Sequence, residues 1–457
     1  MITLVLLLFL GRYLAHAEPA SVAQDIVQTV SIFSKKYEDK FDMKIRIYDE
    51  IPCDNREVLK LEGLNIMDIQ DNLIQSDTIR HVSFRNNSLI KVSPEILSRV
   101  SRLSCLDLSK NKINLKNTNF IKHSTVRVLD LSDQTPEFPE WRFTEAEDLK
   151  DIRKNIESIT FNIIDMYLPN LEHLLLNGND IISLPDTFSK SFPKLTHIYL
   201  NNIKAINVNP DFFNVIPKTL RALHLKNNNL SNLTLTNMTG ITDLYLDGNP
   251  SLMNIEINSK KLLILSLSNG SAMASNIILH TPYLEYLDIS RNKYYSLPII
   301  EYDNLQSLKI ILLDYNEFSS FPLFRFNLPI IKLSLSYNKL LQISSESFER
   351  LTFLKMLSLR GNRIKHIESD AFKDLNHLQF LDLSENQLVK LPNGWAFSLM
   401  NLQFFNVSSN YFEKISDLSV SSFNAISHLF ILNTTFITDI STKDLAILPN
   451  KITVYLH

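Results

Sequence analysis

Apolar residues recur along this chain in a register of eleven positions that returns about every 24 residues. Apolar side chains fill positions 1, 4, 6 and 11, and asparagine fills position 9 in most copies. The register is clearest in LEHLLLNGNDI from Leu171, LRALHLKNNNL from Leu220, LKMLSLRGNRI from Leu354 and LQFLDLSENQL from Leu378. Repetition at about this period indicates a solenoid, in which each repeat buries its apolar side chains against its neighbours.

Each copy predicts one short strand, a turn, and a return segment of irregular, 3-10 or short helical structure. We expect an α/β solenoid shaped as a horseshoe, with a parallel sheet on its concave face. Repeats can be started at Val58, Ile79, Leu103, Val126, Leu171, Leu195, Leu220, Ile241, Leu262, Leu284, Leu308, Ile330, Leu354, Leu378, Leu402 and Ile426. The repeat domain is therefore predicted to span residues 58–457 with about 15 to 16 repeats.

One interval in this series is about twice as long as the others. Val126 and Leu171 are 45 residues apart, and IESITF from Ile156 is the nearest remnant of an intervening copy. Residues 135–155 depart from the register and contain Trp141 among acidic residues. They predict an irregular insertion, either a surface loop folded over the convex side or a functional projection.

The asparagine of position 9 predicts a buried hydrogen-bond ladder. An amide side chain donates and accepts, so it can bond the backbone groups where each coil leaves its strand. The asparagines are Asn87, Asn111, Asn179, Asn228, Asn249, Asn292, Asn316, Asn338, Asn362, Asn386 and Asn410. The other residues in this slot are Gln134, Ile203, Gly270 and Thr434. Ile203 cannot make these bonds, and we expect irregular coils from Leu195 and Leu262.

Phenylalanine recurs late in several repeats. Side chains at one place of successive coils lie next to one another, so these rings predict a spine that packs the outer layer and not a cofactor site. The rings are Phe188, Phe213, Phe348, Phe372 and Phe397.

Positions 3, 5, 7 and 8 point away from the core on the concave strand face, where solenoids bind their ligands. Histidines and tyrosines occupy these positions in the middle copies: His173, His197, Tyr199, His224, Tyr245, Tyr286, Tyr315 and Tyr337. Tyrosine is common at recognition surfaces because it offers apolar area and a hydroxyl. These residues are our candidate ligand-binding surface, and cross-strand pairs that only stiffen the sheet are the alternative.

A second candidate surface is an apolar ladder at position 3 near the C-terminal end. It comprises Ile310, Met356, Phe380 and Phe404, with Phe430 and Leu432 beyond and Lys332 interrupting it. Apolar side chains on neighbouring strands form a contiguous patch. Such a patch needs an explanation, whereas single apolar residues scattered over a surface do not. The ladder predicts a partner or self-association contact, or a surface covered by the chain's own terminus.

Charge and motifs argue against nucleic-acid binding and against catalysis. The chain has 46 basic and 49 acidic residues, which gives no reason to expect nucleic acid or an anionic membrane. It has eight glycines and no phosphate-binding loop, and GxSxG, HExxH and CxxC are absent. Five aspartates are expected to be solvated groups in repeat slots: Asp107, Asp130, Asp288, Asp314 and Asp382. We expect no enzyme and no cofactor.

The candidate histidines also raise the question of a metal. His173 and His197 share one position on adjacent strands, and His224 is close by. No cysteine or carboxylate completes a zinc site, so we expect no metal. Ordinary surface histidines are the main interpretation, and pH-sensitive ones are the alternative.

The N-terminus and the sequons predict a secreted glycoprotein. Residues 1–17 contain an apolar core followed by Ala-His-Ala, which is typical of a cleavable signal peptide; a buried N-terminal segment is the alternative. Residues 18–57 predict a capping flank, and no stretch is long enough for a membrane span. The sequons N-x-Ser/Thr lie at Asn86, Asn229, Asn232, Asn237, Asn269, Asn406 and Asn433. They predict glycosylation, although such triplets also arise by chance.

Two cysteines remain for an oxidising compartment. Cys53 lies in the flank and Cys105 on the strand of the second clear repeat, one or two strand spacings away. A direct bridge needs Cα atoms within about 7 Å. An intrachain bridge, a cystine to another chain, and two free thiols are all open.

The copies LEHLLLNGNDIISLPDTFSKSF and LKMLSLRGNRIKHIESDAFKDL resemble extracellular leucine-rich repeat proteins, including Toll-like receptor ectodomains. The signal peptide, sparse cysteines and lack of a span resemble the secreted leucine-rich immune proteins of mosquitoes. That resemblance implies a protein partner, such as another leucine-rich repeat chain or a complement-like protein. The chain departs from that family because it lacks the cysteine cluster and C-terminal coiled coil through which its members dimerise. It would be of a coil-less type.

Together these features predict a secreted recognition protein that binds protein or microbial-surface ligands through its concave face in innate immunity. An extracellular matrix or cell-adhesion scaffold and a soluble enzyme inhibitor are the alternatives.

Overall fold

The computed structural model describes most of the repeat region in two compact units. The described residues are 53, 57–71, 73–93, 95–115, 122–136, 166, 168–179, 181, 184, 188–203, 215–236, 240–270, 276–298, 305–324, 327–420, 425–433, 446–449 and 452–455. The N-terminal unit contains those up to Leu284, and the C-terminal unit those from Glu285 onward. The predicted signal peptide 1–17, nearly all of the flank 18–57 and all but two residues of the insertion 135–155 lie outside this description.

Each unit is a solenoid of parallel coils, as the register predicts. In the coil from Leu378, the apolar side chains of Leu378, Leu381 and Leu383 are fully buried. The residues between and beside them, positions 3 to 5, form a three-residue strand that pairs in parallel with the same positions of the next coil. Alternation within the strand sends positions 3 and 5 to one face and position 4 into the core. The register therefore sets both the core and the outer strand face.

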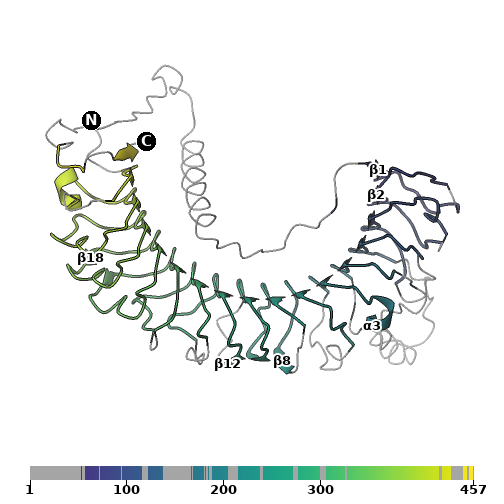
Figure 1. The fold of residues 1–457 in the computed structure, drawn as a ribbon, viewed down its shortest axis with the longest axis horizontal. Helices are drawn as coiled ribbons and strands as arrows, with labels where there is room; N and C mark the ends of the chain where they lie inside the picture. The colour runs from purple at the N-terminus through teal and green to yellow at the C-terminus, as the bar shows by residue number, and fades with distance from the viewer. Residues whose placement is uncertain are drawn as a thin grey trace, which may run out of the picture. The chain divides into compact units, whose positions relative to one another are not determined.

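The N-terminal unit contains one parallel sheet with one strand per coil (Figure 1). Its strands are β1 (Val58–Lys60), β2 (His81–Ser83), β3 (Cys105–Asp107), β4 (Val128–Asp130), β5 (His173–Leu175), β6 (His197–Tyr199), β7 (Ala222–His224), β9 (Asp243–Tyr245) and β11 (Ile264–Ser266). Each pairs with the next in this order. Val58 pairs with His81, so Val58 holds position 3 and not the repeat start that we predicted.

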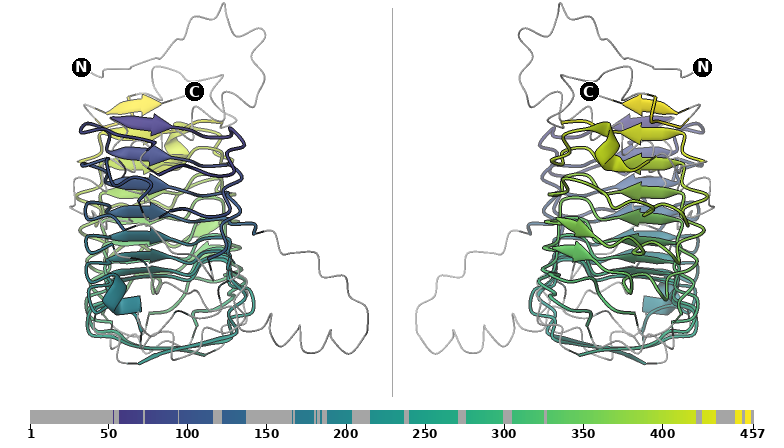
Figure 2. Two further views of the ribbon diagram at one scale, coloured as in Figure 1. Left: turned by 90° about the vertical axis from the view of Figure 1, so that its right-hand side faces the viewer. Right: turned by 90° about the vertical axis from the view of Figure 1, so that its left-hand side faces the viewer.

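The sheet of the C-terminal unit follows the same rule, and both views of Figure 2 show strands stacked coil upon coil. Its strands are β13 (Tyr286–Asp288), β14 (Ile310–Leu312), β15 (Lys332–Ser334), β17 (Met356–Ser358), β19 (Phe380–Asp382), β20 (Phe404–Asn406), β21 (His428–Phe430) and β22 (Thr453–Tyr455). Strand β22 pairs with β21 and adds a coil beyond the last predicted repeat start, Ile426.

Strand β4 pairs directly with β5, although 45 residues separate the two repeat starts. Val128 lies opposite His173, so no strand stands between them in the sheet. The remnant IESITF from Ile156 lies outside the described residues.

The return segments carry short elements of their own. The N-terminal unit has the helix α3 (Phe188–Ser191) and a second sheet of β8 (Asn232–Thr236), β10 (Asn254–Asn258) and β12 (Asn276–His280). The C-terminal unit has the strand pair β16 (Gln342–Ile343) and β18 (His366–Ile367) and the 3-10 helix η3 (Ile415–Leu418). The outer side is thus as irregular as predicted.

The asparagine ladder is confirmed, and all eleven asparagines are buried. Asn386 donates from Nδ2 to the carbonyl oxygens of Leu359 and Leu383 at 2.9 and 3.0 Å. Its Oδ1 accepts from the backbone N–H of Ile364 at 3.1 Å. Gln134 makes the same contacts with its longer amide, since Oε1 accepts from Ile113 and Nε2 donates to Leu108. The ladder ties each coil to the one before it.

The ladder stops at Ile203, as its apolar side chain requires. In regular coils the N–H of position 11 donates to the asparagine side chain of the next coil. The N–H of Ile181, in the coil before Ile203, instead donates to the carbonyl oxygen of Asn179 at 3.1 Å. Residues 204–214, which would show how irregular this coil is, lie outside the described residues.

The aromatic spine differs from our prediction at one end. Phe348 stacks on Phe372 at 5.5 Å, and Phe372 meets the edge of Trp395 at 5.6 Å. Trp395 is 1% exposed and donates from Nε1 to the carbonyl of Leu418, whereas Phe397 is 72% exposed. The prediction of Phe397 as a spine residue is therefore wrong, because the tryptophan two residues earlier fills that place. Phe213 lies outside the described residues.

Cys53 and Cys105 form an intrachain disulfide with Cα atoms 5.8 Å apart. Cys105 holds position 3 of β3, and it packs in one cluster with Val128, Leu175 and Tyr199 on the strand face. The bridge therefore fixes Cys53 to that face. The bridge closes a loop with a sequence separation of 52 residues. By lowering the entropy of the unfolded chain, it adds about 4 kcal/mol to the free energy of unfolding.

Candidate ligand-binding surface

The parallel register aligns the candidate residues of the N-terminal unit in two rows on the strand face. Position 3 places His173 opposite His197. Position 5 places Tyr199 opposite His224, and His224 opposite Tyr245. We call these five residues the His–Tyr cluster.

The rings of the His–Tyr cluster stack face to face. The ring centroids of His173 and His197 are 4.1 Å apart, those of Tyr199 and His224 are 4.2 Å apart, and those of His224 and Tyr245 are 4.4 Å apart. The planes differ by at most 18°. These are cross-strand contacts of the kind that stiffens a sheet.

The His–Tyr cluster is buried and is therefore not an open ligand-binding surface. All five residues are buried, and His224 is 1% exposed. Burial lowers the pKa of His173 and of His224 to about 3 and that of His197 to about 4, with neighbouring charged or histidine side chains adding to the effect. The histidines are therefore neutral at physiological pH. His173 Nδ1 and His224 Nε2 are buried without a hydrogen-bond partner.

The accessible candidates are Tyr315 and Tyr337, in the C-terminal unit. Tyr315 is 43% exposed and Tyr337 is half-buried, whereas Tyr286 is buried. Both accessible tyrosines hold position 8, and their φ angles are 55° and 56°. A left-handed backbone is costly for a side chain other than asparagine, aspartate or glycine, by roughly 1 kcal/mol. Position 8 has a positive φ in most described coils, and Lys110, Arg291, Glu385 and Ser409 hold it too, so the coil and not the tyrosine sets this conformation.

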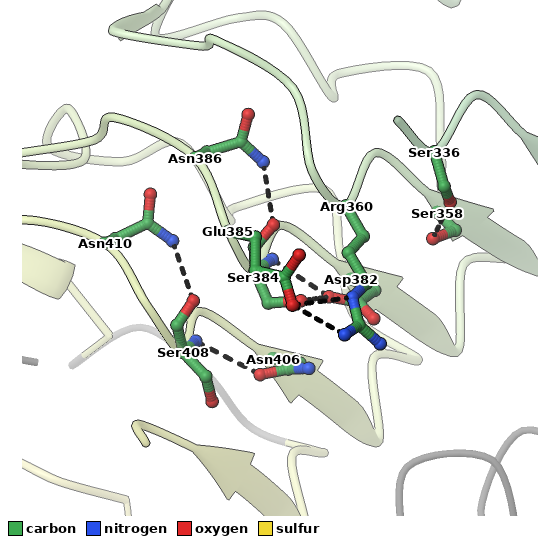
Figure 3. A network of polar contacts seen from close by, with 10 residues as sticks. All are labelled: Ser336, Ser358, Arg360, Asp382, Ser384, Glu385, Asn386, Asn406, Ser408 and Asn410. Atoms are coloured by element: carbon green, nitrogen blue, oxygen red, sulfur yellow. Dashed lines mark hydrogen bonds and ion pairs between the residues drawn. The ribbon is translucent and has the colours of Figure 1, made fainter. Parts of the chain in front are cut away.

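The two tyrosines form part of an ordered column along the edge of the strand face. Their rings stack at 4.5 Å, and the Arg291 guanidinium lies 4.3 Å from the Tyr315 ring centroid. At the other end the Arg360 guanidinium lies 5.6 Å from the Tyr337 centroid and pairs with Glu385 at 2.5 Å (Figure 3). We call Arg291, Tyr315, Tyr337, Arg360 and Glu385 the tyrosine column.

Tyr337, near one end of this column, is partly buried and has a charged partner. Tyr337 bonds to Glu385, and burial is the main cause that raises the pKa of Tyr337 to about 12. Sequence analysis did not identify Arg291, Arg360 or Glu385. The available signal was a cation at position 7 or 8 beside a tyrosine at position 8 of the adjacent coil.

The apolar ladder is not exposed. Ile310, Met356, Phe380 and Phe404 are buried, and the rings of Phe380 and Phe404 stack at 4.2 Å. The series continues through Phe430 to Tyr455, whose rings stack at 4.1 Å. Lys332 stands between Ile310 and Met356 in the register, as expected. These side chains pack on one another across the strands, so they do not offer the open contact surface that we predicted.

The aspartates in repeat slots are not simply solvated, contrary to our prediction. Asp382 is buried, and its Oδ1 accepts from the N–H and the hydroxyl of Ser384 at 2.9 and 2.6 Å (Figure 3). Asp107, Asp130 and Asp288 likewise accept from the serine N–H two residues later. Asp314 accepts from Ser336 of the next coil at 2.7 Å. These carboxylates cap the turn where the chain leaves each strand.

The sequons separate by position. Asn86, Asn269 and Asn433 are exposed at position 8, and Asn229 and Asn232 are exposed on the return segment. Asn406 is 2% exposed and its Oδ1 accepts from the Ser408 N–H, so glycosylation of the folded chain at Asn406 is excluded. Asn237 lies outside the described residues.

No cluster of three histidine, cysteine or acidic side chains with metal-binding geometry occurs among the residues that the structure describes. Within the same residues, no helix has the length and apolar character to cross a membrane.

Comparison with known proteins relates the chain to leucine-rich repeat proteins. A model of the leucine rich repeat family matches residues 330–388. Mouse podocan is 27% identical over 408 residues, which are 78% of this chain and 66% of podocan. Rat lumican is 30% identical over 192 residues, 40% of this chain and 54% of lumican. Adenylate cyclase of Schizosaccharomyces pombe is 25% identical over 60% of this chain, but only 16% of that enzyme is covered.

Solved structures agree on the fold. The TLR13–ssRNA13 complex matches 87% of this chain and 58% of that chain with a TM-score of 0.58 and 18% identity. The mouse RP105/MD-1 complex matches 85% of this chain and 76% of that chain with a TM-score of 0.53 and 17% identity. Such identities show the fold and no more. The chain therefore has the leucine-rich repeat fold and is similar in sequence to podocan and lumican.

Proposed function

We propose that the protein is a secreted recognition protein that binds a protein or microbial-surface ligand noncovalently and acts in innate immunity. The observation that carries this proposal is the tyrosine column. Tyr315 and Tyr337 are accessible, and their rings stack on each other. Tyrosine is enriched among the residues that dominate binding energy. The immune role rests on the resemblance of the repeats to secreted immune proteins.

An extracellular location is supported by two features of the described residues. The chain has two cysteines and they form a disulfide, which persists in oxidising compartments. Five of the seven sequons are exposed in the folded chain. We assign the buried His–Tyr cluster a structural part in this function, as a stiffener of the sheet.

Capture of partners from the native body fluid tests the proposal. The full chain is cross-linked there, and the proteins that co-purify are quantified. Replacing Tyr315 and Tyr337 together by alanine should reduce capture of the main partner at least tenfold, because truncating a residue of this kind costs about 1–2 kcal/mol. The matched control replaces Tyr295 and Tyr411, which are 78% and 57% exposed, by alanine. Equal capture by the two double variants would refute the proposal.

A role as an extracellular matrix scaffold is the second candidate. The sequence similarity to mouse podocan and rat lumican is the observation that keeps it open. A scaffold would stay in the matrix fraction during salt extraction, and its expression would not change after infection. A recognition protein of innate immunity would be free in the fluid and induced by infection.

A further inference from the structure

The tyrosine column ends in a cation that has no carboxylate partner. Arg291 is exposed, and no described acidic residue forms an ion pair with it. Cations in the next coils are neutralised: Lys309 pairs with Glu285 at 2.7 Å and Lys339 with Glu317 at 3.2 Å. Arg291 and Lys293 of the same coil are exposed cations that no described acidic residue pairs with, and Arg291 is the one that lies over the Tyr315 ring.

The rest of the column holds Arg291 in place. Gly361 has a φ of +67°, and a Cβ there would come within 2.4 Å of the Tyr337 ring. Only glycine leaves room for that ring. Tyr337 is held by Arg360 and Glu385, Tyr315 stacks on Tyr337, and Arg291 stacks on Tyr315. A side chain that is already ordered loses less entropy when it binds.

We propose that Arg291 and Tyr315 bind a carboxylate on an acidic segment of a protein partner, an inference that rests on the proposed function. A guanidinium that lies over a ring keeps its N–H groups free at the edge, where they can bond both oxygens of a carboxylate. The Tyr315 ring supports the cation through its π face, and its hydroxyl can donate to the same ligand.

The surroundings favour a protein carboxylate over a sulfated polysaccharide. Asp288 and Asp314 lie in the same two coils as Arg291 and Tyr315, and Glu317 follows. Because these carboxylates lower the local positive potential, the bidentate pairing of one carboxylate with the guanidinium edge matters more here than the high density of negative charge that a sulfated polysaccharide offers. Position 8 carries no sequon from Arg291 to Ser409.

Binding of the full chain to immobilised poly-L-glutamate and to heparin tests the proposal. The wild-type chain should bind poly-L-glutamate, and Arg291→Gln should weaken that binding about tenfold, as loss of a charge-assisted pair does. Tyr315→Ala should weaken it too, while Tyr315→Phe should retain part of it because the ring is kept. The matched control is Arg363→Gln, which removes another exposed arginine.

Three results would overturn the proposal: no binding of poly-L-glutamate by the wild-type chain, equal losses in Arg291→Gln and Arg363→Gln, or stronger Arg291-dependent binding to heparin. Partner capture separates this inference from the proposed function. If Arg291→Gln captures the partner normally while the double tyrosine variant does not, recognition by the column stands and the carboxylate assignment fails. If neither variant affects capture, the proposed function fails as well.

Discussion

At the scale of the residue, the buried amides join one coil to the next through side-chain hydrogen bonds. Each ladder asparagine satisfies carbonyl groups of its own coil and of the preceding one, together with an N–H of the preceding coil. The register predicts these residues because a polar side chain at a fixed place between apolar ones has no other role in a solenoid. The register does not predict that the aspartates of position 5 accept hydrogen bonds from the serine two residues later. An aspartate in that place can equally be solvated.

Replacing Asn386 by alanine should lower the free energy of unfolding by about 1–3 kcal/mol, because buried backbone groups lose their partners. Urea denaturation of the full chain measures this change. Asn401 is exposed and donates one bond to the carbonyl of Asn376. Asn401→Ala should change the free energy by less than about 0.5 kcal/mol. Similar losses in the two variants would contradict a ladder that stabilises the fold.

At the scale of the element, the strands follow from the sequence and the packing around them does not. Positions 3 to 5 form strands wherever the register is regular, and β4 pairs with β5 across the interval where the sequence predicted an irregular insertion. The spine shows where prediction from the sequence ends. Phe397 and Trp395 are both aromatic and two residues apart, and only the path of the return segment decides which one is buried.

Truncating Trp395 to alanine should therefore cost about 3–5 kcal/mol, as expected for a large buried aromatic side chain. Phe397→Ala provides the control and should leave the denaturation midpoint nearly unchanged, since that ring is exposed. A larger effect from Phe397 than from Trp395 would mean that the assignment of the spine is reversed.

At the scale of the whole molecule, the candidate surface divides between the two units. The register predicts that the histidines and tyrosines lie on the strand side of their coils. It could not separate accessible from buried members, because exposure depends on neighbours such as Arg360 and Gly361 that belong to other coils. The N-terminal unit thus carries a buried, neutral His–Tyr cluster, and the C-terminal unit carries the accessible tyrosine column.

Acid should destabilise the N-terminal unit. The pKa values of His173, His197 and His224 are about 3 to 4 in the folded chain, against an ordinary histidine pKa of 6.5 that holds in the unfolded chain. The unfolded state then binds more protons between these values, so stability is complete above pH 6.5 and is lost as the pH falls. At pH 5 each histidine accounts for a loss of up to about 2 kcal/mol. Asp130 and Asp243 oppose this in part, because their pKa values are raised to about 6.

Pulse proteolysis in urea at pH 7.5 and pH 5 measures this effect, with fragments assigned to each unit. The midpoint of the N-terminal unit should fall at pH 5. His173→Phe combined with His224→Phe should reduce the fall, because it keeps rings and removes titration. Exposed His377→Phe is the control. A midpoint that is independent of pH would show that the histidines are not buried as described.

Recognition through the tyrosine column is tested most directly by hydroxyl-radical footprinting of the full chain, alone and in the captured complex. The account predicts that Tyr315 and Tyr337 become protected in the complex while Tyr295 and Tyr411 keep their reactivity. Unchanged reactivity of Tyr315 and Tyr337 in a complex that protects other residues would contradict it.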